Sequence, residues 1–224
     1  MIDLSQAKTA ANSIGVSPEV VIMEIYQMVL LDELSGTPLS KKLVFKGGTC
    51  LRLAYNSFRF SEDLDFSLLL PVGFADFSKV VKKIAAKYPE MNIIDLFDMK
   101  QTLFAKLAVG VGDWRVGIKI EISKRKENWR RSADYQLKLL QSPLSGSTPL
   151  INTATLKKIY QDKILTAKNR EKPRDWFDLW FLAQKLGKSW DNKIPLSKKL
   201  MLDRVRFLLP RDKRRILAEF KYES

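Results

Sequence analysis

Residues 43–66, LVFKGGTCLRLAYNSFRFSEDLDF, read as a strand, a glycine turn, a short helix and a second strand. The first three residues form an apolar run that ends near glycine, which is the pattern of a buried strand. Gly47 and Gly48 permit a sharp turn, and Thr49 can cap a helix that runs to Tyr55. The turn therefore places free N–H groups at a helix N-terminus, where a phosphate can bind.

Two carboxylates lie near the end of this stretch. Asp63 and Asp65 are separated by one residue in an extended segment, so both side chains point to one face while Leu64 and Phe66 point to the other. Two like charges side by side repel each other, and neither has a structural task on a solvent face. The pair therefore indicates a site for a divalent cation.

The same residues carry a family resemblance. Gly-Gly-Thr followed by SEDLDF (61–66) resembles the first motif of the DNA-polymerase-beta-like nucleotidyltransferase superfamily, in the variant of the AbiEii/AbiGii toxins of bacterial toxin–antitoxin systems. The resemblance implies an α+β nucleotidyltransferase fold: a mixed β-sheet flanked by helices and followed by a helical C-terminal part. It also implies an NTP substrate, Mg²⁺ or Mn²⁺ at Asp63 and Asp65, and a nucleotide-binding segment that includes Gly47, Gly48, Thr49 and Ser61.

Composition narrows the chemistry. The chain has 224 residues, of which 46% are hydrophobic, and this is ample for a packed core. It contains no run approaching the roughly 20 apolar residues of a membrane span and no signal-peptide pattern at its start, so we expect a cytoplasmic protein without a membrane partner. It has no histidine and one cysteine, Cys50, which excludes the common zinc sites, His-activated nucleophiles and an internal disulfide. Catalysis must come from carboxylates, lysine, arginine and metal.

The positive charge is concentrated in the C-terminal third. The net charge is +14, and residues 151–224 hold 19 Lys and Arg against 9 Asp and Glu. Such an excess favours a polyanionic partner, with RNA as the first candidate, although it also suits solubility or an acidic protein partner. Exposed clusters are expected at Lys198, Lys199, Arg214 and Arg215.

Residues 141–150, QSPLSGSTPL, are rich in Ser, Pro and Gly and mark the best boundary between two parts of the chain. We therefore predict a nucleotidyltransferase domain over residues 1–145, which includes N-terminal helices over 3–13 and 18–34. A basic helical domain over residues 146–224 follows. Trp129 lies among basic residues just before this boundary, where it can stack on a base or anchor a loop.

A third acid comes from a later strand. Residues 74–87 predict an amphipathic helix, and residues 91–97, 102–110 and 115–123 predict three strands, the last two forming a hairpin. In the last strand Ile118, Ile120 and Ile122 share one face, and Glu121 lies on the other. Nucleotidyltransferases of the resembled superfamily usually take a third metal ligand from such a strand, and Glu121 is the matching position. The alternative is that Glu121 pairs with a surface lysine.

A second constellation lies in the helical part. A helix is predicted over about 155–170 and another from Pro173 to Gly187, and Asp175 and Asp178 lie one turn apart in the second. The segment resembles later motifs of AbiEii-type toxins, which implies catalytic roles for Lys163 and Asp175 and nucleotide contacts for Arg174 and Asp178. The alternative is a buried ion-pair network of Arg174, Asp175 and Asp178 that joins the two halves.

Together these features predict a metal-dependent nucleotidyltransferase toxin. Its catalytic residues would be Asp63, Asp65, Glu121, Lys163 and Asp175, with the metal at Asp63, Asp65 and Glu121. It would transfer a nucleoside monophosphate from an NTP to RNA, with a tRNA end as the first candidate, and a cognate antitoxin would be a further partner. Two alternatives stay open: modification of a protein hydroxyl by nucleotidylation or phosphorylation, and a non-catalytic RNA-binding module.

Overall fold

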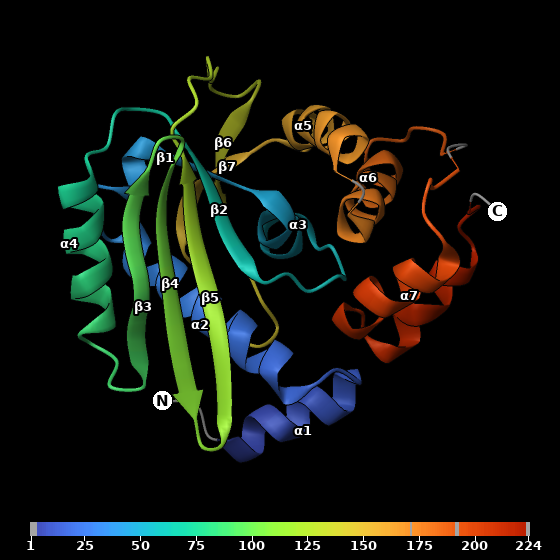
Figure 1. Cartoon of the computed structure of the whole chain (residues 1–224), viewed down its shortest axis with the longest axis horizontal. Coiled ribbons are helices and arrows are strands. Elements are labelled where there is room, and N and C mark those ends of the chain that lie inside the picture. Colours follow the sequence, from blue (N-terminus) through green and yellow to red (C-terminus); the bar gives the residue numbers. More distant parts are fainter. Residues whose placement is uncertain (1–3, 171, 191–192, 223–224) are drawn as a thin grey trace.

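One mixed β-sheet organises the residues that the computed structural model describes, which are 4–170, 172–190 and 193–222 (Figure 1). Across the sheet the order is β3-β4-β5-β2-β1-β7-β6. The strands are β1 (Leu43–Lys46), β2 (Asp63–Leu68), β3 (Met91–Met99), β4 (Thr102–Val111), β5 (Trp114–Ser123), β6 (Tyr135–Leu139) and β7 (Leu150–Ala154). The sheet is flanked by helices and followed by a helical C-terminal part, so the predicted α+β fold class is confirmed.

Strand β2 lies in the middle of the sheet and sets the register of the polar residues. It runs antiparallel to β1, where Asp65 pairs with Lys46, and parallel to β5, where Asp65 pairs with Glu121. Residues paired across neighbouring strands lie on the same face. One row across three strands therefore holds a lysine and two carboxylates.

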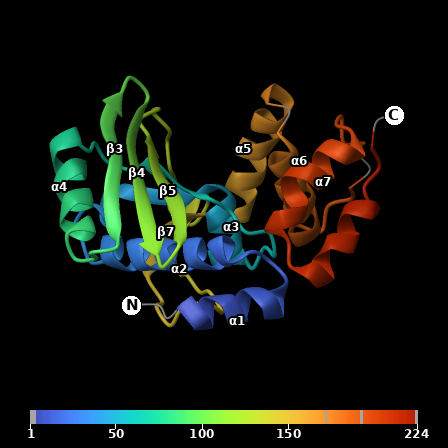
Figure 2. The same cartoon turned by 60° about the horizontal axis from the view of Figure 1, so that its bottom comes forward.

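The opposite face of the sheet is the main core. Alternate residues of β4 and β5 are buried there, as the period of two predicts, because α2 (Pro18–Ser35) and α4 (Phe74–Ala85) pack on that side. Figure 2 shows α4 beside β3 and α2 running across the sheet. Helix α2 begins at the predicted Ser17-Pro18 signal, and α1 (Leu4–Ile14) packs on it.

No single helix in the described part of the chain is long and apolar enough to cross a membrane. Helices α1 and α2 meet that criterion only as a pair bent by 113°, and only by length and composition.

Helix α3 (Gly47–Tyr55) follows β1 without a separate turn. Thr49 was expected to cap it, but the helix begins three residues earlier, at Gly47, with Lys46 in the N-cap position. Gly47 has φ +82°, a value that a side chain would strain, and so it allows the chain to pass directly from strand to helix. Asn56, at φ 59°, ends the helix in the left-handed conformation.

The C-terminal part has a small core of its own. It comprises α5 (Leu156–Asn169), α6 (Pro173–Lys185), α7 (Lys198–Val205) and two 3₁₀ helices (Arg206–Leu208 and Arg211–Ala218). Helix α6 packs between α5 and α7 (Figures 1 and 2). The buried residues of this core are Phe177, Ile194, Leu196, Met201, Val205, Leu209, Leu217 and Phe220. Phe181 and Leu182 of α6 instead join the main core, so α6 connects the two.

Two strands were missed by the sequence patterns. Strand β7 pairs in parallel with β1, with Thr153 beside Phe45, and β6 pairs with β7 at the edge of the sheet. The sheet therefore extends beyond residue 145, and the helical part starts at Leu156. The division into two domains remains a prediction, and its boundary is better placed after Ala154.

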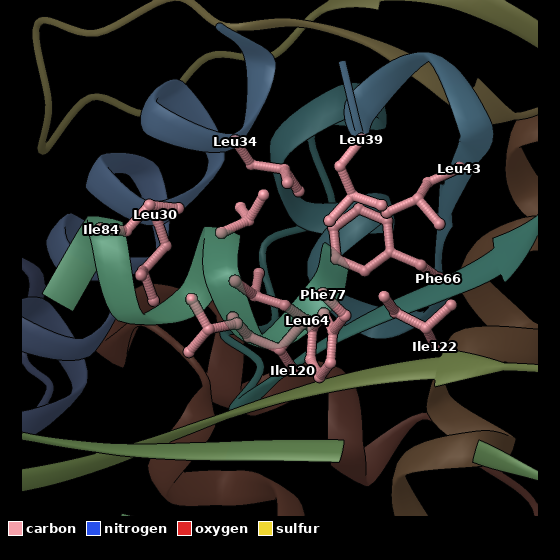
Figure 3. A pocket seen from close by; sticks show the side chains of 12 residues that line it. Leu30, Leu34, Leu39, Leu43, Leu64, Phe66, Phe77, Ile84, Ile120 and Ile122 are labelled. Carbon is pink, nitrogen blue, oxygen red and sulfur yellow. The ribbon is translucent and has the colours of Figure 1, made fainter. Parts of the chain in front are cut away.

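The core contains a small void on the side of the sheet opposite the polar row. It lies between α2, α4 and the core face of the sheet, and its volume is about 20 Å³ (Figure 3). Twelve apolar side chains line it, among them Leu30, Phe66, Phe77 and Ile120. A void of that size without polar groups is a packing defect, and the residues capable of catalysis lie on the other face of the sheet.

Candidate active site

The carboxylates predicted from sequence lie together on the face of the sheet opposite the main core. Asp65 lies between Lys46 and Glu121 in the register, and Asp63 pairs with Lys119, whose Nζ is 3.4 Å from Asp63 Oδ1. The pKa of Asp65 is raised to about 6, mainly by burial and also by the negative charges of Asp63 and Glu121, while Lys163 and Lys46 oppose this rise. These influences place all four groups around Asp65.

The carboxylate oxygens of the site suit a hard divalent cation that also binds the phosphates of a nucleotide. Among the described residues, no three Asp, Glu, Cys or His side chains stand close enough to form a complete metal cage. Mg²⁺, however, is commonly held by one or two carboxylates together with substrate phosphates. Asp63 and Asp65 offer oxygen ligands on one face of β2, and the repulsion around Asp65 is the condition that a cation relieves. The residues therefore fit Mg²⁺ or Mn²⁺, with Glu121 as the adjacent third acid.

The glycine turn lies directly against these carboxylates. A Cβ atom on Gly47 would overlap the carboxylate of Asp65, and one on Gly48 would overlap Arg59 Nη2 and Ser61 Oγ. Both glycines are thus required by close approach, and Gly47 also by its positive φ. The first backbone N–H groups of α3 consequently begin beside Asp65, where a metal-bound phosphate would lie.

Two predicted nucleotide-binding residues are hydrogen-bonded within the protein, Thr49 through its side chain and Ser61 through its backbone. The hydroxyl of Thr49 is buried and donates to the Asp63 carbonyl at 2.5 Å, so it fixes β2 against α3 and does not face a phosphate. Ser61 accepts a hydrogen bond at its carbonyl from Gln27 Nε2 at 2.9 Å, while its hydroxyl faces Gly48. A contact of Ser61 Oγ with a nucleotide remains a prediction.

The residues predicted in the helical part, Lys163, Asp175 and Asp178, reach the same site through a buried ionic network. Lys163 Nζ lies 2.5 Å from Asp175 Oδ1 and 2.7 Å from Asp178 Oδ2. Burial would lower the pKa of Lys163, but the adjacent Asp178 and Asp175 raise it above its ordinary value. Lys163 is therefore a permanently charged ammonium that two carboxylates hold beside Asp65.

Asp178 is a structural member of this network. It is fully buried, and its carboxylate accepts hydrogen bonds from Arg59 Nε and Nη2 at 2.8–2.9 Å. Burial would raise its pKa, but Arg59 and Lys163 together hold the pKa below its ordinary value. The predicted nucleotide contact of Asp178 is corrected accordingly, since no surface of this carboxylate is open to a ligand. The alternative of a buried ion-pair network describes Asp178 better, with Arg59 in the place expected for Arg174.

Arg174 and Asp175 are less enclosed. Arg174 pairs with Glu62, and both side chains are more than a third exposed. Asp175 lies in the first turn of α6 and has Lys163 as its partner. The predicted roles of Arg174 in nucleotide binding and Asp175 in catalysis remain predictions that this geometry allows.

Sequence reasoning missed several residues that support the site. Lys46 faces Asp65 from β1, and its Nζ lies 3.7 Å from Glu127. Glu127 also binds Lys158 at 2.9 Å and accepts from Ser67 Oγ at 2.9 Å. The loop after β5 is thereby fastened to β1, β2 and α5. Trp129 belongs to this fastening: it packs edge-to-face on Tyr135 and lies under Lys158 Nζ, so it anchors the loop.

The signals for these residues were weak. The alternation of β1 places Lys46 opposite to Phe45, but only the pairing of β1 with β2 shows that it faces Asp65. Arg59 lies in the segment between α3 and β2, and its partner Asp178 is 119 residues away. Such long-range pairs leave no local pattern.

The network yields a prediction about stability. Asp178→Ala should lower the free energy of unfolding by about 3–5 kcal/mol, because it leaves the Arg59 guanidinium buried and unpaired. Asp175→Ala should cost only about 1 kcal/mol, since Lys163 keeps Asp178 as a partner. Urea unfolding of both variants tests this, and equal losses would contradict the assignment.

A second prediction concerns pH. The pKa of Asp65 in the folded protein, about 6, lies above the ordinary aspartate value of 3.8. The folded state therefore binds more protons between these values, and the stability contributed by Asp65 falls as pH rises through them. In EDTA, Asp65→Asn should stabilise the protein at pH 7 by roughly 1–2 kcal/mol and have little effect at pH 4. The value at pH 7 is smaller than the full pKa shift implies, because the Asp65 side chain is partly exposed to solvent. Thermal melts at both pH values measure this, with the exposed Asp113→Asn as control; an equal effect at both would contradict it.

Comparison with known proteins identifies the family and supports the fold. The family model described as "Nucleotidyl transferase AbiEii toxin, Type IV TA system" matches residues 29–219. No curated protein matches the chain. Among solved structures, MenT4, a nucleotidyltransferase toxin from Mycobacterium tuberculosis H37Rv, is similar with a TM-score of 0.62 and 20% identity, over 90% of this chain and 68% of that one.

Two Helicobacter pylori structures are also similar. JHP933 has a TM-score of 0.54 and 23% identity over 75% of this chain and 68% of its own. A putative nucleotidyltransferase has a TM-score of 0.51 and 24% identity over 70% of this chain and 65% of its own. At such identities the structures establish the shared fold, whereas the family model spans most of the chain. This protein belongs to the AbiEii nucleotidyltransferase toxin family.

Proposed function

We propose that this toxin transfers a nucleoside monophosphate from an NTP to an RNA acceptor, with a tRNA end as the first candidate, in a metal-dependent reaction. The observation that carries the proposal is the placement of Asp63, Asp65 and Glu121 on one sheet face, with Lys46, Lys163 and the glycine turn beside Asp65. The carboxylates can bind a metal ion and the lysines can bind phosphates, so this arrangement suits a metal-bound triphosphate.

The reaction requires an acceptor hydroxyl to attack the α-phosphorus. A new oxygen–phosphorus bond forms, the bond between the α-phosphorus and its bridging oxygen breaks, pyrophosphate leaves, and the hydroxyl proton passes to a base or to water. Asp63 and Asp65 would hold Mg²⁺, which would supply neutralisation of phosphate charge and a lower pKa for the attacking hydroxyl.

The protein's own groups would position the substrate and balance its charge. The first N–H groups of α3 would receive a phosphate, and Lys163 and Lys46 would offset the charge of the triphosphate. Asp175 and Asp178 would hold the Lys163 ammonium in place. Glu121 would lie on the acceptor side of Asp65, because Lys46 occupies the other side in the strand register.

The basic surface of the C-terminal part supports RNA as the acceptor. Lys198, Lys199 and Arg215 are exposed, whereas Arg214 donates to the carbonyls of Gly15 and Leu209 and is partly buried. Arg214 therefore fastens the end of the chain to the loop after α1, and the RNA-binding surface is expected without it. We place this toxin in the cytoplasm, where its acceptor RNA and a cognate antitoxin would be found.

The catalytic prediction is loss of transfer on removal of the metal ligands. Asp63→Asn and Asp65→Asn should each lower labelling of RNA by a radiolabelled NTP at least ~10³-fold, because each removes a charged ligand from a polar face. Circular dichroism should show unchanged folds, and Asp113→Asn should label RNA like the wild type. Full transfer by either variant would contradict the metal site, and labelling of protein instead of RNA would favour the protein-acceptor alternative.

The acceptor prediction concerns salt and charge. Affinity for tRNA should fall steeply with salt, because each neutralised phosphate releases condensed counterions. Reversing Lys198, Lys199 and Arg215 to Glu should weaken tRNA binding about tenfold or more without changing NTP binding. Reversing Lys79, Lys82 and Lys83 on α4, an equally exposed set, is the matched control. Filter binding over a salt series measures both, and equal affinities would show that the C-terminal charge serves solubility alone.

A further inference from the structure

The row of site residues continues across the sheet into two aromatic side chains. Glu121 pairs with Phe104 on β4, and Phe104 pairs with Phe97 on β3. The two rings are stacked, with centroids 4.9 Å apart and planes inclined by 16°. Lys46, Asp65, Glu121, Phe104 and Phe97 thus form one row across five strands.

This aromatic pair does not belong to the core. The residues that alternate with Phe104 on β4, Leu103 and Ala105, are fully buried on the opposite face, whereas Phe97 is 40% exposed. In Figure 1 no described element crosses this face of β3, β4 and β5. The two stacked rings stabilise the pairing of β3 and β4, but Phe97 leaves apolar surface on this open sheet face that a ligand can cover.

The spacing of the row matches one nucleotide. Neighbouring strands lie about 4.8 Å apart, so Phe104 is about one strand spacing from Glu121, and Phe97 is about 10 Å from it. A hydroxyl held at Glu121 would leave the base of its own nucleotide over this pair. A planar base can then extend the stack that the two rings begin.

Charge decides which substrate uses this side. The triphosphate is assigned to the side of Asp65 where Lys46 lies, and the charge of Lys163 also acts on Asp65. The Glu121 side of the row has no cation, but Lys106 and Lys119 pair with each other two residues along the same strands and on the same face, between Asp95 on β3 and Asp63 on β2. A nucleobase on the rings with its backbone along these lysines is the complementary ligand.

We propose that Phe97 and Phe104 form the platform on which the terminal base of the acceptor RNA stacks, one strand spacing from Glu121. The inference rests on the proposed transfer to RNA and identifies the acceptor as an unpaired end, because a paired base has no free face. The platform selects for a base without reading its identity.

The test combines a protein change with an RNA change. Phe97→Ala should raise the KM for tRNA roughly 5- to 100-fold and weaken binding of a short single-stranded RNA without NTP by a similar factor. The KM for NTP should not change, and Phe97→Trp should keep the wild-type values. Leu137→Ala, at an exposed apolar position on the opposite edge strand, is the matched control. A thermal melt confirms that each variant is folded.

An RNA whose terminal nucleotide lacks its base distinguishes the loss of base stacking from other effects of the Phe97→Ala substitution. The wild type should bind this RNA as weakly as Phe97→Ala binds the intact RNA, and Phe97→Ala should lose nothing further. If the wild type labels RNA and Phe97→Ala does so with the wild-type KM, the platform is excluded while the proposed function stands. If the wild type labels no RNA, the proposed function fails and this inference fails with it.

Discussion

The buried carboxylate of Asp178 holds the helical part of the molecule against the sheet. It accepts three hydrogen bonds from Arg59 and lies 2.7 Å from Lys163, with no exposed surface of its own. A charge in such surroundings is tolerated only when its partners are in place. Helix α6 can therefore pack only where Arg59 meets it, and this position also brings Lys163 beside Asp65.

The same network explains why so much charge can be buried near the site. Arg59 emerges from the segment that follows the glycine turn, and its guanidinium lies against Gly48. Arg59 thus fixes the relative positions of the glycine turn, β2 and α6. This arrangement brings the first N–H groups of α3, the Asp65 carboxylate and the Lys163 ammonium together.

The site itself opposes stability. Burial and the charges of Asp63 and Glu121 raise the pKa of Asp65, which means that the ionised form is unfavourable in the folded protein without a cation. Such conflicts between local energetics and the fold are expected where residues serve a ligand. The rings of Phe97, which is exposed, and Phe104, which is partly buried, are a second conflict of this kind, in the same row of residues.

The sequence by itself determined the local elements and the family. Periodicity and capping residues are short-range properties, and they predicted α2, α4, the β4–β5 hairpin and the strand of Asp63 and Asp65 closely. Only the tertiary structure decided which of these elements meet. Strands β6 and β7, the position of Lys46 and the pairing of Arg59 with Asp178 depend on residues distant in the chain. Hydrogen bonding between strands and the burial of paired charges are satisfied only in the assembled fold, so no local pattern records them.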